Sequence, residues 1–273
     1  MGTGVFEGFL LVSDLDNTLF GEKQSIPQKN IDAIEYFISN GGYFTFATGR
    51  GIVAAKKLTK GVPRNAPAIL FNGAVLYDFL TESVIYETGI RTVNAKKILK
   101  DINNKFPDIP KVVFYKEKMY CTSKGENMNI FQKNLSMDGI YCEIDDIPMP
   151  WYKILCGGSE TDIQSLYNYI SSLNYNEFDY TCSLPVLLEI LSKNINKASG
   201  LTRLMSYLNI EKQKTAAAGD YYNDTEILKA AEYSFVPQNA APELKEFAYK
   251  IVCDHKEGAI FDVVSHLEQI IKK

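Results

Sequence analysis

The sequence predicts an α/β protein with a doubly wound, Rossmann-like parallel-sheet core and an inserted α+β domain. Short apolar runs alternate with amphipathic segments at the start of the chain, in the strand, helix, strand order typical of parallel sheets. Between about 81 and 185 the pattern changes to helices mixed with several short strands, and the first pattern then resumes. We therefore predict a core formed by 1–80 and 186–273 and an inserted domain formed by 81–185.

The first strand of this core ends in two acidic residues. Residues 9–12 form a continuous apolar run, which is typical of a strand buried on both faces. Because side chains alternate along extended chain, Asp14 and Asp16 should project to one side while Leu15 turns to the core. Two carboxylates this close indicate an acid/base couple or a hard cation such as Mg²⁺. An Asx-type turn capped by Asp16 and Asn17 is the alternative.

The second strand delivers a hydroxyl group and glycines to the start of a helix. Residues 43–47 are predicted to form a second buried strand, followed by Thr48, Gly49 and Arg50 and then by a helical pattern over 52–60. Such a turn can present backbone N–H groups to an anion. The alternative is that Thr48 is only a helix N-cap. A third strand follows at 68–71 and leads into a turn at Asn72.

The inserted segment and the return to the core are predicted from the same periodicities. Helices are expected at 93–105, 124–136 and 160–172, and strands at 111–115, 118–122, 139–144, 151–157 and 176–181. The apolar run 186–191 is predicted to return the chain to the core. Two further strand–helix units, 234–236 with 241–248 and 250–252 with 258–270, should complete it.

Further polar groups lie at the later strand and helix ends. Lys197 opens an amphipathic helix, where its charge opposes the helix dipole, so it should face an anion unless it is a solvated surface lysine. A small-residue strand at 215–219 ends in Asp220, with Asn223 and Asp224 in the following turn. Four buried carboxylates at one sheet edge are costly unless a divalent cation and an anionic ligand compensate them.

Composition narrows the classes of function. The net charge is −4, the apparent pI is near 5.4, and basic residues are scattered, so nothing favours nucleic acid as a partner. The five cysteines form no Cys-x-x-Cys pair and indicate a reducing compartment. No apolar run reaches the length of a membrane span, so we expect a soluble cytoplasmic protein. His255 and His266 are interpreted as structural or exposed.

Together these segments resemble motifs I to IV of the haloacid dehalogenase (HAD) superfamily. The segments are 14–18, 48–50, Lys197 and 219–224, and their order with a large insertion is similar to Cof-type hydrolases with a C2B cap (type IIB). Residues 72–74 and 257–259 also resemble segments of that subfamily. The match covers the core, whereas the cap matches only by its position in the chain and its mixture of helices and short strands. Asn17 stands where the commoner motif has glycine.

The resemblance implies a phosphomonoester hydrolase that works through an aspartyl-phosphate. Asp14 would be the nucleophile and Asp16 the general acid and base. Thr48 would hold phosphoryl oxygens, and Lys197 would neutralise Asp14 and the phosphate.

The resemblance also implies a cofactor and a substrate class. Mg²⁺ would be bound by Asp14, the backbone carbonyl of Asp16, Asp220 and Asp224. The residues expected to bind the substrate are Thr18, Gly49, Arg50, Asn72 and Asn223. The inserted cap would set specificity for a small phosphorylated metabolite, with a sugar phosphate expected and nucleotides, flavin or pyridoxal phosphates open. Oligomeric state is not predicted.

Other classes of function fit less of the sequence. A phosphomutase of the same superfamily would use the same groups. A receiver-like signalling module would need neither Asp16 nor an inserted domain. The presence of all the motif acids disfavours a catalytically silent phosphate-binding protein on the same scaffold. A calcium loop starting at Asp14 would need glycine at Leu19 and glutamate at Ser25.

Overall fold

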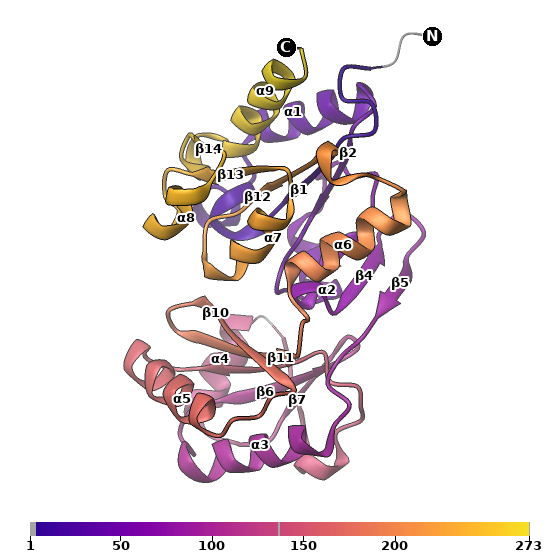
Figure 1. The fold of residues 1–273 in the computed structure, drawn as a ribbon. Coiled ribbons are helices and arrows are strands. Elements are labelled where there is room, and N and C mark those ends of the chain that lie inside the picture. The colour runs from indigo at the N-terminus through magenta and orange to yellow at the C-terminus, as the bar shows by residue number, and fades with distance from the viewer. Residues whose placement is uncertain (1–3, 136, 273) are drawn as a thin grey trace. The chain divides into compact units, whose positions relative to one another are not determined.

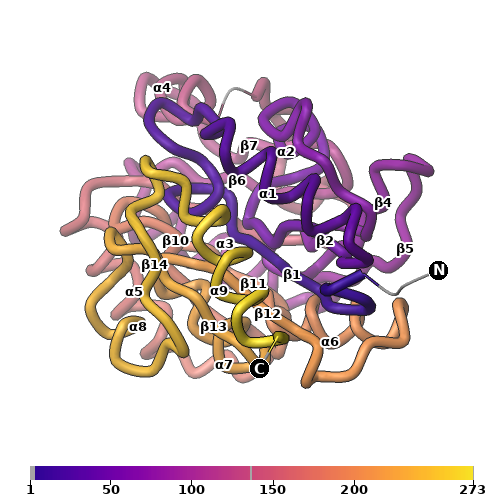
Figure 2. Tube along the Cα trace, turned by 90° about the horizontal axis from the view of Figure 1, so that it is seen from above, coloured from indigo at the N-terminus to yellow at the C-terminus, as the bar shows by residue number. Residues whose placement is uncertain are grey.

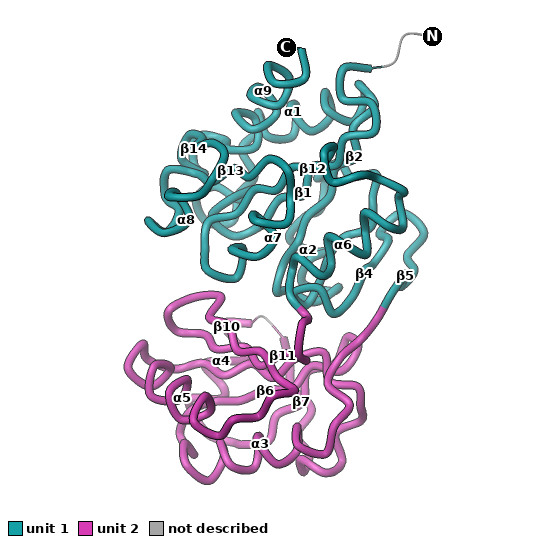
Figure 3. Tube along the Cα trace, viewed as in Figure 1, with its two compact units in different colours: residues 1–86, 196–273 teal, residues 87–195 magenta. Residues whose placement is uncertain are grey.

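The chain folds into two compact units. The computed structural model describes residues 4–135 and 137–272. One unit contains the chain up to Tyr86 and from Asn196 onward, and the other contains Glu87–Ile195 (Figure 3). The second unit is thus inserted between two segments that fold together.

The first unit is built on a parallel sheet with strand order β14-β13-β12-β1-β2 (Figure 1). All four strand pairs in it are parallel. The strands are β1 (Leu10–Ser13), β2 (Tyr43–Phe46), β12 (Thr215–Ala218), β13 (Tyr233–Pro237) and β14 (Lys250–Val252). The predicted fold class, a parallel-sheet core with an α+β insertion, is confirmed.

Helices cover both faces of this sheet. Leu10 and Val12 of β1 pack in a core with residues of α6 and α7, while Leu11 between them is also completely buried. The opposite face is covered by α1 and α9, which contact each other (Figure 2). The helices are α1 (Gln28–Ser39), α2 (Ile52–Leu58), α6 (Lys197–Leu208), α7 (Thr225–Ala230), α8 (Pro242–Phe247) and α9 (Ala259–Ile271).

A small antiparallel sheet continues the first unit beyond β2. It contains β3 (Ala68–Leu70), β4 (Val75–Asp78) and β5 (Ser83–Glu87), and a parallel bridge from Ala47 to Ile69 joins its start to the end of β2. The carboxyl end of β3 therefore lies beside the segment that follows β2.

The second unit is a six-stranded sheet, order β10-β11-β9-β6-β7-β8, with three helices. Its core packs α3 and α5 against alternate residues of the strands, including Val113, Ile154 and Leu188. The elements are α3 (Val93–Lys105), β6 (Lys111–Tyr115), β7 (Lys118–Cys121), α4 (Glu126–Leu135), β8 (Ile140–Tyr141), β9 (Lys153–Gly157), α5 (Glu160–Ser172), β10 (Phe178–Leu184) and β11 (Leu187–Ser192).

The strand expected to return the chain to the core does not do so. The apolar run at 186–191 becomes β11, which pairs with β9 and β10 inside the second unit. Leu188 and Ile190 fill the core of that unit. The prediction was wrong because an apolar run shows that a strand is buried but not which sheet buries it.

Candidate active site

Three neighbouring strands bring polar residues to one edge of the core sheet. Asp14 follows β1, Asp220 follows the adjacent β12, and Thr48 follows β2 on the other side. The backbone N–H of Asp14 donates to the carbonyl of Ala218 at 2.8 Å, so the β1 and β12 ends stay in register. Parallel pairing places all these carboxyl ends together, as in other open α/β sheets.

The centre of this edge is a buried acidic cluster, formed by Asp14, Asp220 and Asp224. One carboxylate oxygen from each lies within 4.8 Å of the others. Lys197 is buried beside them, and its ammonium group donates to Asp14 Oδ1 at 2.5 Å and to Asp224 Oδ1 at 2.6 Å. Three carboxylates thus face one fixed cation.

The turn after β12 holds the acidic cluster in place. The second oxygen of Asp224 accepts hydrogen bonds from the backbone N–H groups of Asp220 and Tyr221, at 3.1 and 3.2 Å. The Thr18 hydroxyl donates to Asp220 Oδ1 at 3.0 Å. A Cβ at Gly219 would lie 2.5 Å from the Cβ of Asp224, so a side chain at 219 would displace the Asp224 carboxylate.

Lys197 owes its position to the start of α6. Asn196 is the N-cap residue and forms a reciprocal capping box with Ser199. The helix start packs against the turn after β3, where Gly73 has φ 98° and a Cβ would lie 2.1 Å from the carbonyl oxygen of Asn196. Only glycine fits there, because a side chain at position 73 would push away the start of α6. The close packing at Gly73 therefore allows Lys197 to reach the sheet edge.

Burial and mutual repulsion shift the pKa values of the acidic cluster. Burial raises the pKa of Asp14 well above its ordinary value, and Asp224 and Asp220 raise it further, against the opposing effect of Lys197. The pKa of Asp220 is raised to about 7, by burial and then by Asp224. Burial alone would lower the pKa of Lys197, but Asp14 and Asp224 raise it above its ordinary value. With all three carboxylates ionised, the acidic cluster would carry more negative charge than Lys197 compensates.

This excess charge fits a divalent metal ion. Oxygen ligands from carboxylates are those that Mg²⁺ and Ca²⁺ prefer. The close approach of the three carboxylate oxygens and the raised pKa of Asp220 are both relieved by a dication. The chain thus has an acidic triad suited to a metal.

We expect the stability of the metal-free protein to fall as pH rises. The pKa values of Asp14 and Asp220 are raised on folding, so the folded state binds more protons than the unfolded state between about pH 4 and about pH 7. The stability from this source is complete below the unfolded values and is lost through the folded ones. Melting temperatures in a chelator, measured from about pH 5 to about pH 8, should therefore decrease.

Magnesium should remove most of this decrease. Bound cation stabilises the charged form of the carboxylates, so added Mg²⁺ should raise the melting temperature more at about pH 8 than at about pH 5. An equal effect of Mg²⁺ at both pH values would contradict the assignment of the triad as a cation site.

Asp16 lies outside the acidic cluster and is paired with Arg50. The guanidinium donates from Nε to Asp16 Oδ2 at 2.8 Å and from Nη2 to Oδ1 at 2.7 Å. The two side chains are 40% and 30% exposed. Thr48 is buried, and its hydroxyl oxygen accepts the backbone N–H of Arg50 at 3.2 Å.

Three other residues expected to bind substrate, Gly49, Asn72 and Asn223, lie in the turns that follow the core strands. Gly49 is half-buried between Thr48 and Arg50. Asn72 is buried in the turn after β3, and its backbone N–H donates to the carbonyl of Thr48 at 3.0 Å. Asn223 is half-buried on the short turn Tyr222–Asp224, and the ammonium of Lys197 bonds to Asp224 rather than to it.

Three side chains from outside the loop after Asp14 support it, two of them from far along the chain, and the sequence did not indicate them. Asn30 Nδ2 donates to the carbonyl of Leu19 at 3.1 Å, and Asn239 Nδ2 to that of Asn17 at 2.9 Å. Nδ1 of the buried His255 lies 2.6 Å from the carbonyl oxygen of Phe20. His255 is structural, as interpreted. No local pattern marks such contacts, because each joins a side chain to a distant carbonyl.

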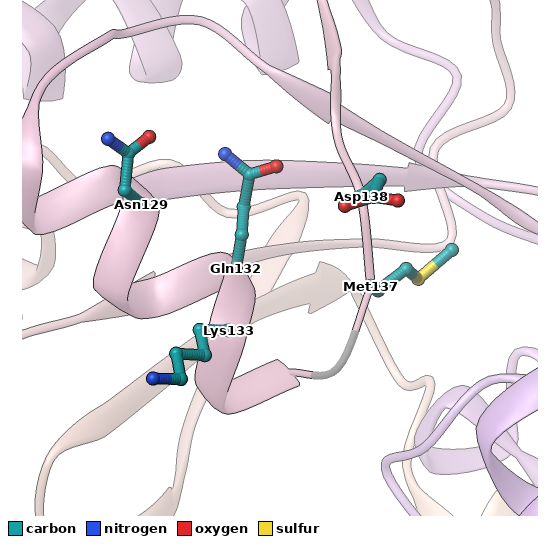
Figure 4. A pocket seen from close by; sticks show the side chains of 5 residues that line it. All are labelled: Asn129, Gln132, Lys133, Met137 and Asp138. Carbon is teal, nitrogen blue, oxygen red and sulfur yellow. The ribbon is translucent and has the colours of Figure 1, made fainter.

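The second unit has a hollow of its own. It has a volume of about 410 Å³ and is lined by residues of α4 and the segment after it: Asn129, Gln132, Lys133, Met137 and Asp138 (Figure 4). The amide of Gln132 is already used, because its Nε2 donates to the Tyr141 hydroxyl and its Oε1 accepts the backbone N–H of Gly139. None of the predicted site residues lines this hollow.

A doubly wound core with an acidic triad and a buried lysine at one sheet edge is suited to an enzyme of metal-assisted hydrolysis. The model of the haloacid dehalogenase-like hydrolase family matches residues 11–264. The chain belongs to this family, as its motifs indicated, and is an enzyme of the phosphatase type.

Individual relatives agree with this assignment. Phosphatase YwpJ from Bacillus subtilis is 24% identical over 301 residues, covering 94% of this chain and 99% of the relative. The 5-amino-6-(5-phospho-D-ribitylamino)uracil phosphatase YitU from the same organism is 22% identical, covering 92% and 94%. The solved structure of the HAD subclass IIB sugar phosphatase BT4131 has a TM-score of 0.81 at 20% identity, covering 94% and 98%, and shows the fold. Within the described residues, no helix combines the length and apolar character of a membrane span.

Proposed function

We propose that the protein is a Mg²⁺-dependent phosphomonoester hydrolase that acts through an aspartyl-phosphate on a small phosphorylated metabolite. The observation that carries this proposal is the contact of Lys197 with Asp14 beside Asp220 and Asp224. A buried carboxylate whose charge is balanced from one side by lysine can act as a nucleophile towards a phosphate ester. The remaining negative charge favours a metal at the same edge.

Asp14 supplies the nucleophile in the first step. Lys197 holds Oδ1, and Oδ2 has no hydrogen-bond partner among the described residues, so Oδ2 is the atom proposed to attack phosphorus. The bond from phosphorus to the ester oxygen breaks, and its electron pair goes to that oxygen. Asp16 donates the proton that the leaving oxygen takes up.

Water completes the reaction in the second step. Asp16, now a carboxylate, takes a proton from a water molecule that attacks the phosphorus of the aspartyl-phosphate. The bond from phosphorus to Asp14 Oδ2 breaks, its electron pair returns to the Asp14 carboxylate, and inorganic phosphate leaves. The Thr48 hydroxyl and the backbone of Gly49 are proposed to bind phosphoryl oxygens, together with Arg50, Asn72 and Asn223. Thr18 keeps Asp220 in place.

Mg²⁺ is the proposed cofactor. It would be held by Asp14, Asp220, Asp224 and the backbone carbonyl of Asp16, and when bound it neutralises charge on the transferring phosphoryl group.

The second unit, Glu87–Ile195, is proposed to be the cap that sets substrate specificity. A sugar phosphate is the proposed substrate class, supported by the fold shared with a subclass IIB sugar phosphatase. YitU acts on a phosphoribitylamino compound, which also carries a polyol phosphate. The five free cysteines support a cytoplasmic location.

Phosphate release from a panel of phosphorylated metabolites tests the proposal. We expect hydrolysis that is lost in EDTA and restored by excess Mg²⁺, because chelation leaves the acidic cluster uncompensated. Phosphorus NMR of the products distinguishes the hydrolase from a phosphomutase. An isomeric phosphate ester without free phosphate, or activity unaffected by EDTA, would refute the proposed reaction.

A further inference from the structure

Arg50 holds the carboxyl group of Asp16 through a two-point contact. Nε and Nη2 each donate to a different oxygen of Asp16, at 2.8 and 2.7 Å. A guanidinium and a carboxyl group paired in this way share a plane, so the contact determines direction as well as distance. A lysine in the same place could hold one oxygen but not the plane of the group.

Arg50 is itself fixed at both of its peptide groups. Its backbone N–H donates to the hydroxyl oxygen of Thr48 at 3.2 Å, and its carbonyl accepts the N–H of Phe71 at 3.1 Å. The following residue, Gly51, packs so closely on Phe71 that a Cβ would lie 2.5 Å from the ring. The guanidinium therefore extends from a turn whose backbone is held between β2 and β3.

Asp16 has no comparable support of its own. Its backbone is extended, with φ −74° and ψ 129°, and the next residue, Asn17, has φ 55°. Among the described residues, Arg50 is the one side chain that bonds to its carboxyl group. With 40% of the side chain exposed, Asp16 would otherwise sample several rotamers.

We propose that Arg50 is a positioning residue for proton transfer by Asp16, in addition to any contact that it makes with phosphate. This inference depends on the proposed function, in which Asp16 protonates the leaving oxygen. The two hydrogen bonds to Asp16 use two of the five guanidinium N–H donors of Arg50, so the others can still contact an anion. Loss of Arg50 should therefore reduce proton donation more than it reduces the binding of phosphate esters.

Two esters that differ in the leaving group separate these effects. p-Nitrophenolate is a weak base that leaves without a proton, whereas the alkoxide of p-nitrobenzyl phosphate must be protonated as its bond to phosphorus breaks. The two esters have the same aromatic ring and differ by one methylene group. Correct proton donation contributes about a hundredfold or more to a rate, and only the benzyl ester depends on it.

We expect Arg50→Gln to lower kcat/KM for p-nitrobenzyl phosphate at least about tenfold more than kcat/KM for p-nitrophenyl phosphate. This parameter excludes hydrolysis of the aspartyl-phosphate, in which Asp16 acts as base whichever ester was used. Arg50→Lys should recover part of the difference, because it restores one hydrogen bond. Lys57→Gln is the matched control, since it removes an exposed positive charge from α2 and should leave both rates unchanged. Melting curves of the variants show that they are folded.

A double-mutant cycle with Asp16→Asn gives the decisive readout. If Arg50 acts through Asp16, adding Arg50→Gln to Asp16→Asn should not change the ratio of the two kcat/KM values any further. An equal loss on both esters, or the same loss with and without Asp16, would overturn the inference in favour of phosphate binding alone. Wild-type protein inactive on both esters would instead overturn the proposed function.

Discussion

Asp14→Asn should abolish Mg²⁺-dependent hydrolysis of a generic aryl phosphate, with a loss of at least about a thousandfold in kcat. The amide keeps the shape of the side chain and an oxygen that can accept from Lys197, but it lacks the charge needed for attack on phosphorus. Replacement of one of three crowded acids also relieves repulsion with Asp220 and Asp224. Activity should therefore fall while stability in a chelator is unchanged or higher.

The comparison with a matched variant makes this result specific. Asp32→Asn changes the same functional group at an exposed position on α1 and should retain full activity. Phosphate release and melting temperature are measured for both variants. An Asp14→Asn protein that is folded and as active as the wild type would eliminate the aspartyl-phosphate mechanism.

Lys197→Met should strongly destabilise the metal-free protein. The ammonium group has no exposed surface and is the cation between Asp14 and Asp224, so its removal leaves buried carboxylates without a partner. Breaking a buried ion pair by removing one member costs about 3–5 kcal/mol. We expect a decrease of that size in the free energy of unfolding at about pH 7.5, together with loss of activity.

Acidic pH should reduce this penalty, because protonation of Asp14 removes part of the uncompensated charge. Urea unfolding in EDTA at about pH 5 and about pH 7.5 measures the difference, with Lys57→Met as the exposed control. If Lys197→Met were as stable as the wild type at both pH values, the lysine would not be compensating the acidic cluster.

The meeting of Asp14, Lys197, Asp220 and Asp224 could be predicted from the sequence. The prediction used three physical rules. The first two are that the carboxyl ends of parallel strands share one edge, and that buried carboxylates require compensating charge. A lysine at the start of a helix was informative because it opposes the helix dipole. The structure places all four groups as those rules require.

Side-chain partners were harder to predict than positions along the strands. The sequence did not indicate the partner of Asp16, whose carboxylate accepts hydrogen bonds from Arg50, a residue 34 positions away. Its charge still contributes to the raised pKa of Asp14. Strand β11 was assigned to the wrong sheet because its apolar pattern suits either unit. The partner of a side chain and the sheet that a strand joins both depend on tertiary packing, which cannot be predicted from the periodicity of the sequence.

The hydrogen bonds from Asn239 and His255 affect how the active site is completed during synthesis. They reach carbonyls of the loop after Asp14 from positions 222 and 235 residues later in the chain. Asp14 is synthesised long before these two residues, so its loop lacks both supports until Asn239 and His255 have been translated. We therefore expect the loop after Asp14 to reach its final form late in folding of the first unit.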